Sequence, residues 1–226
     1  MNDETFLRRY GTVLGLFLCV LIPLILFGFL AEDVADKDIF PFDYPIMAAL
    51  HARSTPLFDI LMLGASAAGS VYGLLPFNLA IFGYCVWRRK MHAATFWVLA
   101  IGGGLLLNLI TKQFFHRTRP TFWESIAPET SFSFPSGHAM CSMATAAALV
   151  VLFRRSQWRA HVTVIAVFCV LMVGVSRPYL GVHFPSDILA GWTAALAWVV
   201  GLAIIGAHAR SWRERRLTLI ADDMHK

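Results

Sequence analysis

The chain has 226 residues, of which 58% are hydrophobic and 15% are charged, and its mean hydropathy is +0.63. This composition is too apolar for a soluble domain and far from that of a disordered chain, so it indicates an integral membrane protein. The formal net charge of +5 does not indicate a nucleic-acid partner, because the basic residues lie in short runs between apolar segments, where they act as topology signals.

The first predicted element is a membrane span from Gly11 to Leu30, which has about the twenty residues that a helix needs to cross a bilayer. Arg8 and Arg9 precede it, and the acidic Glu32 follows it where a signal peptide would have a small-residue cleavage site. We therefore expect an uncleaved first span. After an acidic connector, the segment from Tyr44 to Asp59 mixes apolar and charged residues, which predicts an amphipathic helix in the membrane interface.

Five further apolar segments predict five more membrane spans. The segment from Leu61 to Trp87 is long enough for one span, and its glycines permit a break or close packing against neighbouring helices. Between the third and fourth spans, Lys112 to Ser136 is polar and contains prolines, which predicts a structured loop. The other spans are expected at Ala93 to Ile110, His138 to Phe153, Val162 to Val175 and Ile188 to Ala207. We therefore expect an all-α polytopic membrane protein with six transmembrane helices and a single domain over residues 1–226.

The basic residues divide unequally between the two sides of this six-span arrangement. With the N-terminus in the cytoplasm, the cytoplasmic segments hold 13 of the 19 lysines and arginines, as the positive-inside rule requires, and both termini are cytoplasmic. Most of the outer basic residues lie in two short stretches, namely Lys112, Arg117, Arg119 and Arg177. Topology does not explain this concentration, so these cations need another role.

Three polar segments emerge on the outer side in this topology: KQFFHRTRP at residues 112–120, PSGH at 135–138 and SRPYLGVHFPSD at 176–187. Ionisable groups are costly near hydrocarbon, so their presence at the ends of spans indicates a functional site. PSGH immediately precedes the fourth span and Pro185 suits the first turn of the sixth, so two helix N-termini can direct free amides at an anion. We expect the three segments to form one anion-binding site.

The side chains of these segments suit a phosphate group. Arginine forks match phosphate oxygens bidentately, and lysine adds a point charge. The hydroxyl and amide groups of the PSGH segment add neutral donors. The predicted phosphate-binding residues are Lys112, Arg119, Ser136, Gly137 and Arg177.

Two histidines suit different steps of phosphoryl transfer. His183 and Asp187 are four residues apart, so the carboxylate can hold one imidazole nitrogen and leave the other as a nucleophile. His138 can then protonate the leaving alkoxide. The sequence has no carboxylate cluster for Mg²⁺, and its four cysteines lack the spacing of a zinc site or a disulfide framework. We expect a phosphohistidine intermediate, with no metal and no cofactor.

The pattern K-x6-RP, PSGH, SR-x5-H-x3-D resembles the type 2 phosphatidic acid phosphatase (PAP2) superfamily of membrane lipid phosphatases, which is related to vanadium haloperoxidases and glucose-6-phosphatase. All three motifs are complete and in order over residues 112–187. The resemblance implies that His183 is the nucleophile, that His138 is the general acid and that Asp187 orients His183. It further implies that the phosphoryl oxygens are bound by Lys112, Arg119, Arg177 and the amides of Ser136 and Gly137.

Three features lie outside this pattern. Arg117 is two residues before Arg119, and we expect it at the surface or in contact with lipid headgroups. Pro178 directly follows Arg177 and should bias that arginine away from helical geometry. The loop from Pro120 to Pro135 is short, which leaves little room for an elaborate lid.

The resemblance implies a lipid phosphatase of the bacterial inner membrane, with its active site at the periplasmic or extracellular face. Its expected partners are a lipid phosphate substrate and membrane lipids, with no nucleic acid. Undecaprenyl pyrophosphate is the favoured substrate, ahead of phosphatidylglycerophosphate and phosphatidic acid. One alternative is a lipid phosphotransferase or lipid A phosphatase with the same site. Another is a transporter that uses the same cations to bind an anionic solute.

Overall fold

A computed structural model of the protein describes residues 3–36 and 40–224. Within these ranges every regular element is a helix, which confirms the predicted all-α class. Two of the 19 basic residues counted for the topology, Lys37 on the predicted outer side and Lys226 on the cytoplasmic side, lie outside the described residues. The helices are α1 (Asp3–Ala35), α2 (Asp43–His51), α3 (Pro56–Gly69), α4 (Val71–Trp87), α5 (Met91–Phe115), α6 (Gly137–Phe153), α7 (Arg159–Tyr179) and α8 (Pro185–Met224).

Within the described residues, four helical segments are long and apolar enough to cross a membrane, and α3 and α4 together make a fifth candidate if they count as one bent span. The four are Phe17–Ala35, Met91–Phe115, Arg159–Tyr179 and Pro185–Ala209. Helix α6 is apolar but has only 17 residues. The structure therefore supports a multi-pass membrane protein, while the sixth span stays a prediction. A short helix, α2, lies in the first half of the segment that was predicted to be amphipathic.

The second predicted span is not one straight helix. The axes of α3 and α4 differ by 48°, and the break falls at Ser70, whose backbone is extended. The Ser70 hydroxyl donates to the Ala67 carbonyl at 2.7 Å and accepts a bond from the Gly73 amide at 2.9 Å. This serine therefore satisfies backbone groups at the end of one helix and at the start of the next, which stabilises the break.

Helices α5, α6 and α8 pack closely because small residues line their contact. Trp97 of α5 is almost completely buried against alanines of α6 and α8, including Ala144 and Ala195. The starts of α6 and α8 approach so closely that a Cβ atom built on Gly191 would lie 2.8 Å from the carbonyl oxygen of Ser136. Only glycine permits this separation between the two backbones.

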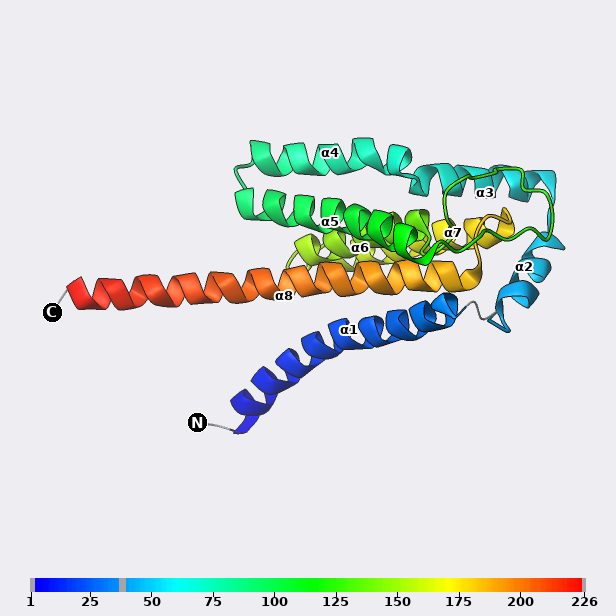
Figure 1. Ribbon diagram of the computed structural model, residues 1–226. Coiled ribbons are helices and arrows are strands. Elements are labelled where there is room, and N and C mark those ends of the chain that lie inside the picture. The colour runs from blue at the N-terminus through cyan, green and yellow to red at the C-terminus, as the bar shows by residue number, and fades with distance from the viewer. Residues whose placement is uncertain (1–2, 37–39, 225–226) are drawn as a thin grey trace.

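All three predicted motif segments reach the same end of the helix bundle (Figure 1). Helices α5 and α7 end there and α6 and α8 begin there, and α2 and the long loop before α6 cover that end. The connection between α4 and α5, which carries the basic run from Arg88 to Lys90, lies at the opposite end together with the C-terminal part of α8. The bundle thus separates the motif segments from this basic run.

Candidate active site

His183 and Asp187 form the buried pair that their spacing predicts. His183 lies in the turn between α7 and α8, Asp187 lies in the first turn of α8, and both side chains are completely buried. Nδ1 of His183 is 3.3 Å from Oδ2 of Asp187, and Nε2 is 3.0 Å from Nη1 of Arg119. Because a guanidinium group only donates hydrogen bonds, Nε2 is the acceptor and the imidazole proton lies on Nδ1, facing Asp187.

The environment keeps His183 in its neutral form. Burial is the main reason that the pKa of His183 falls from 6.5 to about 4, and the positive charges of Arg119 and Arg177 act in the same direction. Asp187 opposes the shift but does not reverse it. Near pH 7 Nε2 of His183 therefore carries no proton, and its lone pair accepts the hydrogen bond from Arg119. A substrate would have to replace this bond before Nε2 could act as a nucleophile.

Lys112 and Arg119 meet at one serine of the loop before α6. The Oγ atom of Ser131 accepts hydrogen bonds from Nζ of Lys112 and from Nη2 of Arg119, each at 3.0 Å. Arg119 also donates to the carbonyl oxygens of Ser131 and Val182, each at 2.7 Å. These bonds hold two of the predicted phosphate ligands beside His183.

Arg177 is buried with one donor left unused. Its Nη1 donates to the hydroxyl of Ser66 in α3, and its Nη2 contacts the carboxylate of Glu129. Its Nε is buried and has no hydrogen-bond partner within the described part of the chain. A buried unpaired donor is costly, and an oxygen of a phosphoryl group is a suitable acceptor for it.

The PSGH segment starts α6 as predicted, but part of it has a structural task. The Ser136 hydroxyl accepts a bond from the Ala139 amide, and the Ser136 amide donates to the carbonyl oxygen of Asp187 at 3.1 Å. This amide therefore joins the starts of α6 and α8, although it was predicted to bind phosphate. Gly137 is the first helical residue, so its amide has no acceptor within the helix. His138 follows on the same turn.

Glu129, which the sequence analysis did not single out, lies at the centre of the site. Its Oε2 is 2.7 Å from Nη2 of Arg119 and 3.8 Å from Nε2 of His183, and its Oε1 is 3.8 Å from Nδ1 of His138. Burial by itself would raise the pKa of Glu129, but the positive charges, first that of Arg177, outweigh burial and lower the pKa to about 2. One ionised carboxylate thus contacts both arginines and lies close to both histidines.

The sequence carried little signal for Glu129. It lies in a proline-containing loop together with a second acidic residue, Glu124, and neither spacing nor periodicity distinguishes the two. Only the path of the loop brings the Glu129 side chain to the four site residues.

Arg117 does not lie at the surface, so that prediction was wrong. Its side chain is 13% exposed and forms ion pairs with Asp187 at 2.6 Å and with Asp43 of α2 at 3.2 Å. The segment that follows α5 is not helical, and residues two apart in an extended chain point to the same side. The position of Arg117 two residues before Arg119 was the signal that could have predicted its inward direction.

The expected effect of Pro178 was also wrong. Helix α7 continues through Arg177 and Pro178 to Tyr179. Pro178 lacks an amide donor and its ring lies against the preceding turn, so one hydrogen bond near the end of α7 is lost, but the helix continues to Tyr179. The buried contacts of Arg177 with Ser66 and Glu129 hold its backbone in the helix against the weaker preference of a residue that precedes proline.

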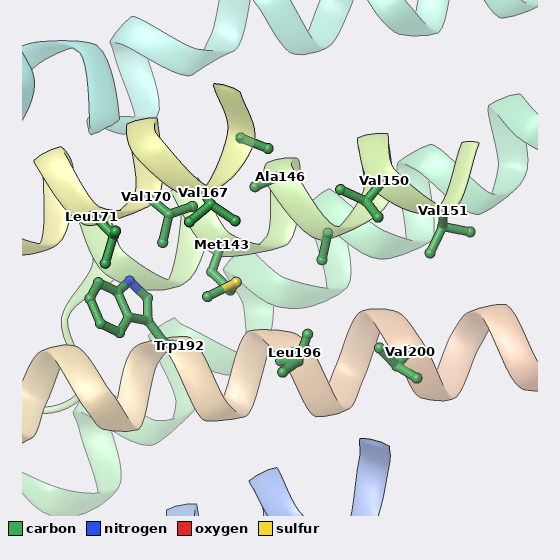
Figure 2. Close-up of a pocket in the computed structure, with 12 residues that line it drawn as sticks. Met143, Ala146, Val150, Val151, Val167, Val170, Leu171, Trp192, Leu196 and Val200 are labelled. Atoms are coloured by element: carbon green, nitrogen blue, oxygen red, sulfur yellow. The ribbon is translucent and has the colours of Figure 1, made fainter. Parts of the chain in front are cut away.

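A separate hollow of about 290 Å³ lies between α6, α7 and α8 (Figure 2). Its lining includes Met143, Val170, Trp192 and Leu196, and it contains no charged residue. None of the residues that line it is a predicted site residue. This hollow suits hydrocarbon, so recognition of an anion belongs to the polar end of the bundle.

This chain is similar to known proteins in sequence and in fold. The PAP2 superfamily model matches residues 93–213. Phosphatidylglycerophosphatase B of Bacillus subtilis (strain 168) is 34% identical over 175 residues, which cover 75% of this chain and 86% of that protein. Undecaprenyl-diphosphatase of Sulfolobus acidocaldarius is 24% identical over 169 residues, which cover 72% of this chain and 77% of that protein.

A solved structure agrees with the same assignment. The crystal structure of a transmembrane PAP2 type phosphatidylglycerolphosphate phosphatase from Bacillus subtilis has a TM-score of 0.70 and 29% sequence identity to this chain, covering 84% of this chain and 96% of that one. The resemblance that rested on three short motifs is confirmed over most of the chain, which belongs to the PAP2 superfamily.

Proposed function

We propose that this protein is a membrane lipid phosphatase that releases phosphate from a lipid phosphate monoester or pyrophosphate through a phosphohistidine on His183. The observation that carries the proposal is the position of the Glu129 carboxylate. This one anion contacts Arg119 and Arg177 and lies 3.8 Å from both His138 and His183. A phosphoryl group bound there in its place would meet two guanidinium groups, a nucleophile and a proton donor.

The reaction has two steps at this site. Nε2 of His183 attacks the phosphorus atom, the bond to the leaving oxygen breaks, and His138, which must enter this step protonated, gives that oxygen its proton. In the second step His138 takes a proton from water, the water oxygen attacks phosphorus, and the P–N bond breaks to release phosphate. Asp187 accepts the hydrogen bond from the Nδ1–H group throughout, with its Oδ2 3.3 Å from Nδ1, and stabilises the charge that forms on the imidazole.

The cations act on the charge of the transferring group. Arg119, Arg177 and Lys112 lie at fixed positions around the site, held by Ser131, Val182 and Ser66. In phosphoryl transfer, positioned cations stabilise the equatorial oxygens of the transition state, which is the main contribution that a protein can make. The unpaired Nε of Arg177 adds a donor for one of these oxygens.

The proposed membrane arrangement has six spans, in which α3 and α4 form one bent span and α6 forms a short one. The site then lies at the periplasmic or extracellular face of a bacterial inner membrane, and both termini lie in the cytoplasm. The positive-inside distribution of basic residues supports this orientation. A phosphate at the ends of the helices is at headgroup level, which suits an amphiphilic substrate.

Two substrates are the leading candidates. The proposed outward-facing site favours undecaprenyl pyrophosphate as the substrate. The Sulfolobus acidocaldarius relative carries the name of an undecaprenyl-diphosphatase. Phosphatidylglycerophosphate is the substrate in the name of the more similar Bacillus subtilis relative. Both present a terminal phosphate on a membrane anchor, which is the chemistry that the cation cluster can bind.

The test is a phosphate-release assay with purified protein in detergent micelles. The panel contains undecaprenyl pyrophosphate, phosphatidylglycerophosphate, phosphatidate and lipid A, each with and without a chelator. We expect release from at least one of them, unchanged by the chelator, and loss of release in His183→Ala. Quenching in alkaline detergent, in which the P–N bond of a phosphohistidine is stable, should trap a phosphoenzyme in the wild type and none in the His183→Ala variant. Activity retained in His183→Ala would rule out this mechanism. Uptake of an anionic solute by vesicles that contain the protein, without phosphate release, would favour a transporter.

A further inference from the structure

Arg117 connects the partner of the nucleophile to helix α2. Its Nη1 donates to Oδ1 of Asp187 at 2.6 Å and to the hydroxyl of Ser186 at 2.8 Å, and its Nη2 lies 3.2 Å from Oδ2 of Asp43. The side chains of Asp187 and Asp43 are 0% and 1% exposed. Two buried carboxylates thus share one arginine, so each depends on it for charge compensation.

Arg117 completes the set of donors around Asp187. Oδ2 of Asp187 accepts bonds from the Ser133 hydroxyl, from the Phe184 amide at 2.9 Å and from Nδ1 of His183 at 3.3 Å. Oδ1 faces Arg117. Because both oxygens are bound, the carboxylate cannot rotate away from His183 without breaking bonds on both sides.

Asp43 and two aromatic rings hold the arginine in turn. Asp43 accepts bonds from the amide of Ser186 at 2.9 Å and from its hydroxyl at 2.6 Å, which anchors α2 to the start of α8. The guanidinium carbon of Arg117 lies 4.2 Å from the ring centre of Phe184 and 5.7 Å from that of Phe40. These contacts fix the plane of the guanidinium group.

We propose that Arg117, held by Asp43, is a positioning residue that keeps Asp187 ionised and directed at Nδ1 of His183. The proposal rests on the proposed function of His183 as the nucleophile. Arg117 acts through Asp187 and does not itself touch the reacting phosphoryl group.

The role of Arg117 has a consequence for the pH dependence of the reaction. In the wild type the pKa of His183 is about 4, mainly because of burial, so the nucleophile is neutral above about pH 5. Without the positive charge of Arg117, the buried Asp187 lacks its cation and attracts a proton more strongly, to itself or to His183. Either location of the proton disables the pair, so the acidic fall in kcat/KM moves to higher pH.

Other charged groups surround the pair and stay unchanged when Arg117 alone is substituted. They come from α2, α5, the loop before α6, α6 and α7, and they are Asp43, Lys112, Arg119, Glu129, His138 and Arg177. Any change in the acidic limb between variants with one and the same substrate therefore reports the substituted charge.

The experiment measures kcat/KM between pH 4 and 8 for the wild type, Arg117→Gln, Arg117→Lys, Asp43→Asn and Arg53→Gln with one lipid phosphate substrate in micelles. Arg117→Gln should lower kcat/KM at pH 7 by roughly tenfold to hundredfold and move the acidic limb up by roughly one pH unit. Arg117→Lys should keep the limb of the wild type but lose about tenfold in kcat/KM, because lysine lacks the fork. Arg53→Gln removes an exposed arginine at the end of α2 and should behave as the wild type.

Asp43→Asn changes the charge near Asp187 in the opposite direction to Arg117→Gln. It should lower kcat/KM by releasing Arg117, yet it should not move the acidic limb to higher pH, because it removes a negative charge. Folding of each variant is checked by size-exclusion chromatography in detergent. If Arg117→Gln does not fold, the kcat/KM values and acidic limbs of Arg117→Lys and Asp43→Asn test the positioning role.

The outcomes separate this proposal from the proposed function. A folded Arg117→Gln variant with an unmoved limb, or an Arg117→Lys variant with the kcat/KM of the wild type, would overturn the positioning role alone. A wild type without phosphatase activity, or a fully active His183→Ala variant, would overturn the proposed function and this role with it.

Discussion

At the scale of single residues, the site contains its own anion. The carboxylate of Glu129 forms ion pairs with the arginines that we expect to bind phosphate. Its pKa of about 2 keeps it ionised throughout the physiological pH range. In the proposed function, a substrate phosphate would therefore displace Glu129 from Arg119 and Arg177, and part of the binding free energy would be spent on this exchange.

Glu129→Gln should increase the affinity of the free enzyme for inorganic phosphate by roughly tenfold, because the neutral amide competes less for the guanidinium groups. The measurement is the competitive inhibition constant of phosphate in the lipid phosphatase assay. Glu124→Gln is the matched control, since Glu124 lies exposed on the same loop, and it should leave the constant unchanged. Equal or weaker phosphate binding by Glu129→Gln would contradict direct competition.

At the scale of elements, the geometry of the site depends on the close approach of α6 and α8. The amide of Ser136 at the start of α6 donates a hydrogen bond to the backbone carbonyl oxygen of Asp187 at the start of α8. Gly191 has no side chain that would keep the two backbones apart. His138 lies two residues after Ser136 and His183 lies four residues before Asp187, so both histidines are close in sequence to this backbone bond. The distance between the two proposed catalytic histidines is thus set by the backbone contact of two helices.

Gly191→Ala should separate these helix starts. The added Cβ would lie 2.8 Å from the Ser136 carbonyl oxygen and 3.2 Å from the Met140 amide nitrogen, and backbone atoms cannot rotate away. We expect kcat/KM to fall by roughly tenfold or more and the free energy of unfolding to fall by about 1–3 kcal/mol. Gly201→Ala in the same helix meets nothing within 4 Å, so it serves as the control with unchanged activity. Thermal unfolding in detergent and the lipid phosphatase assay measure the two effects, and equal behaviour of both variants would refute the packing argument.

At the scale of the whole molecule, the bundle has a polar end and an end that carries the basic run between α4 and α5 (Figure 1). Lipid-facing helices and a polar site at their ends are the arrangement that a membrane-anchored phosphate requires. The proposed orientation places the polar end outside the cytoplasm.

One added cysteine per variant tests this orientation. In intact cells, a membrane-impermeant maleimide should label Glu124→Cys in the loop before α6, while Gln157→Cys between α6 and α7 should react only after permeabilisation. Both positions are exposed, and the parental protein with its four native cysteines gives the background. Labelling in the reverse pattern would show that the site faces the cytoplasm.

The sequence alone was sufficient to predict the helical class, the membrane character and the family, because these depend on local patterns. A bilayer demands long apolar helices, so hydropathy finds most of them directly. The pairing of His183 with Asp187 was also predictable, since a four-residue spacing at a helix start brings the two side chains together. The motif residues were found for the same reason, because each motif is short and contiguous.

Only the tertiary structure revealed which groups surround these motifs. Arg117 and Asp43 are 74 positions apart, and Arg177 and Ser66 are 111 positions apart, so no local period connects them. Glu129 reaches the cations through the path of an irregular loop, and Ser70 breaks a stretch that hydropathy alone reads as one span. Charge compensation inside a buried site is a long-range requirement, and the chain meets it with residues that are brought together only when the helices pack.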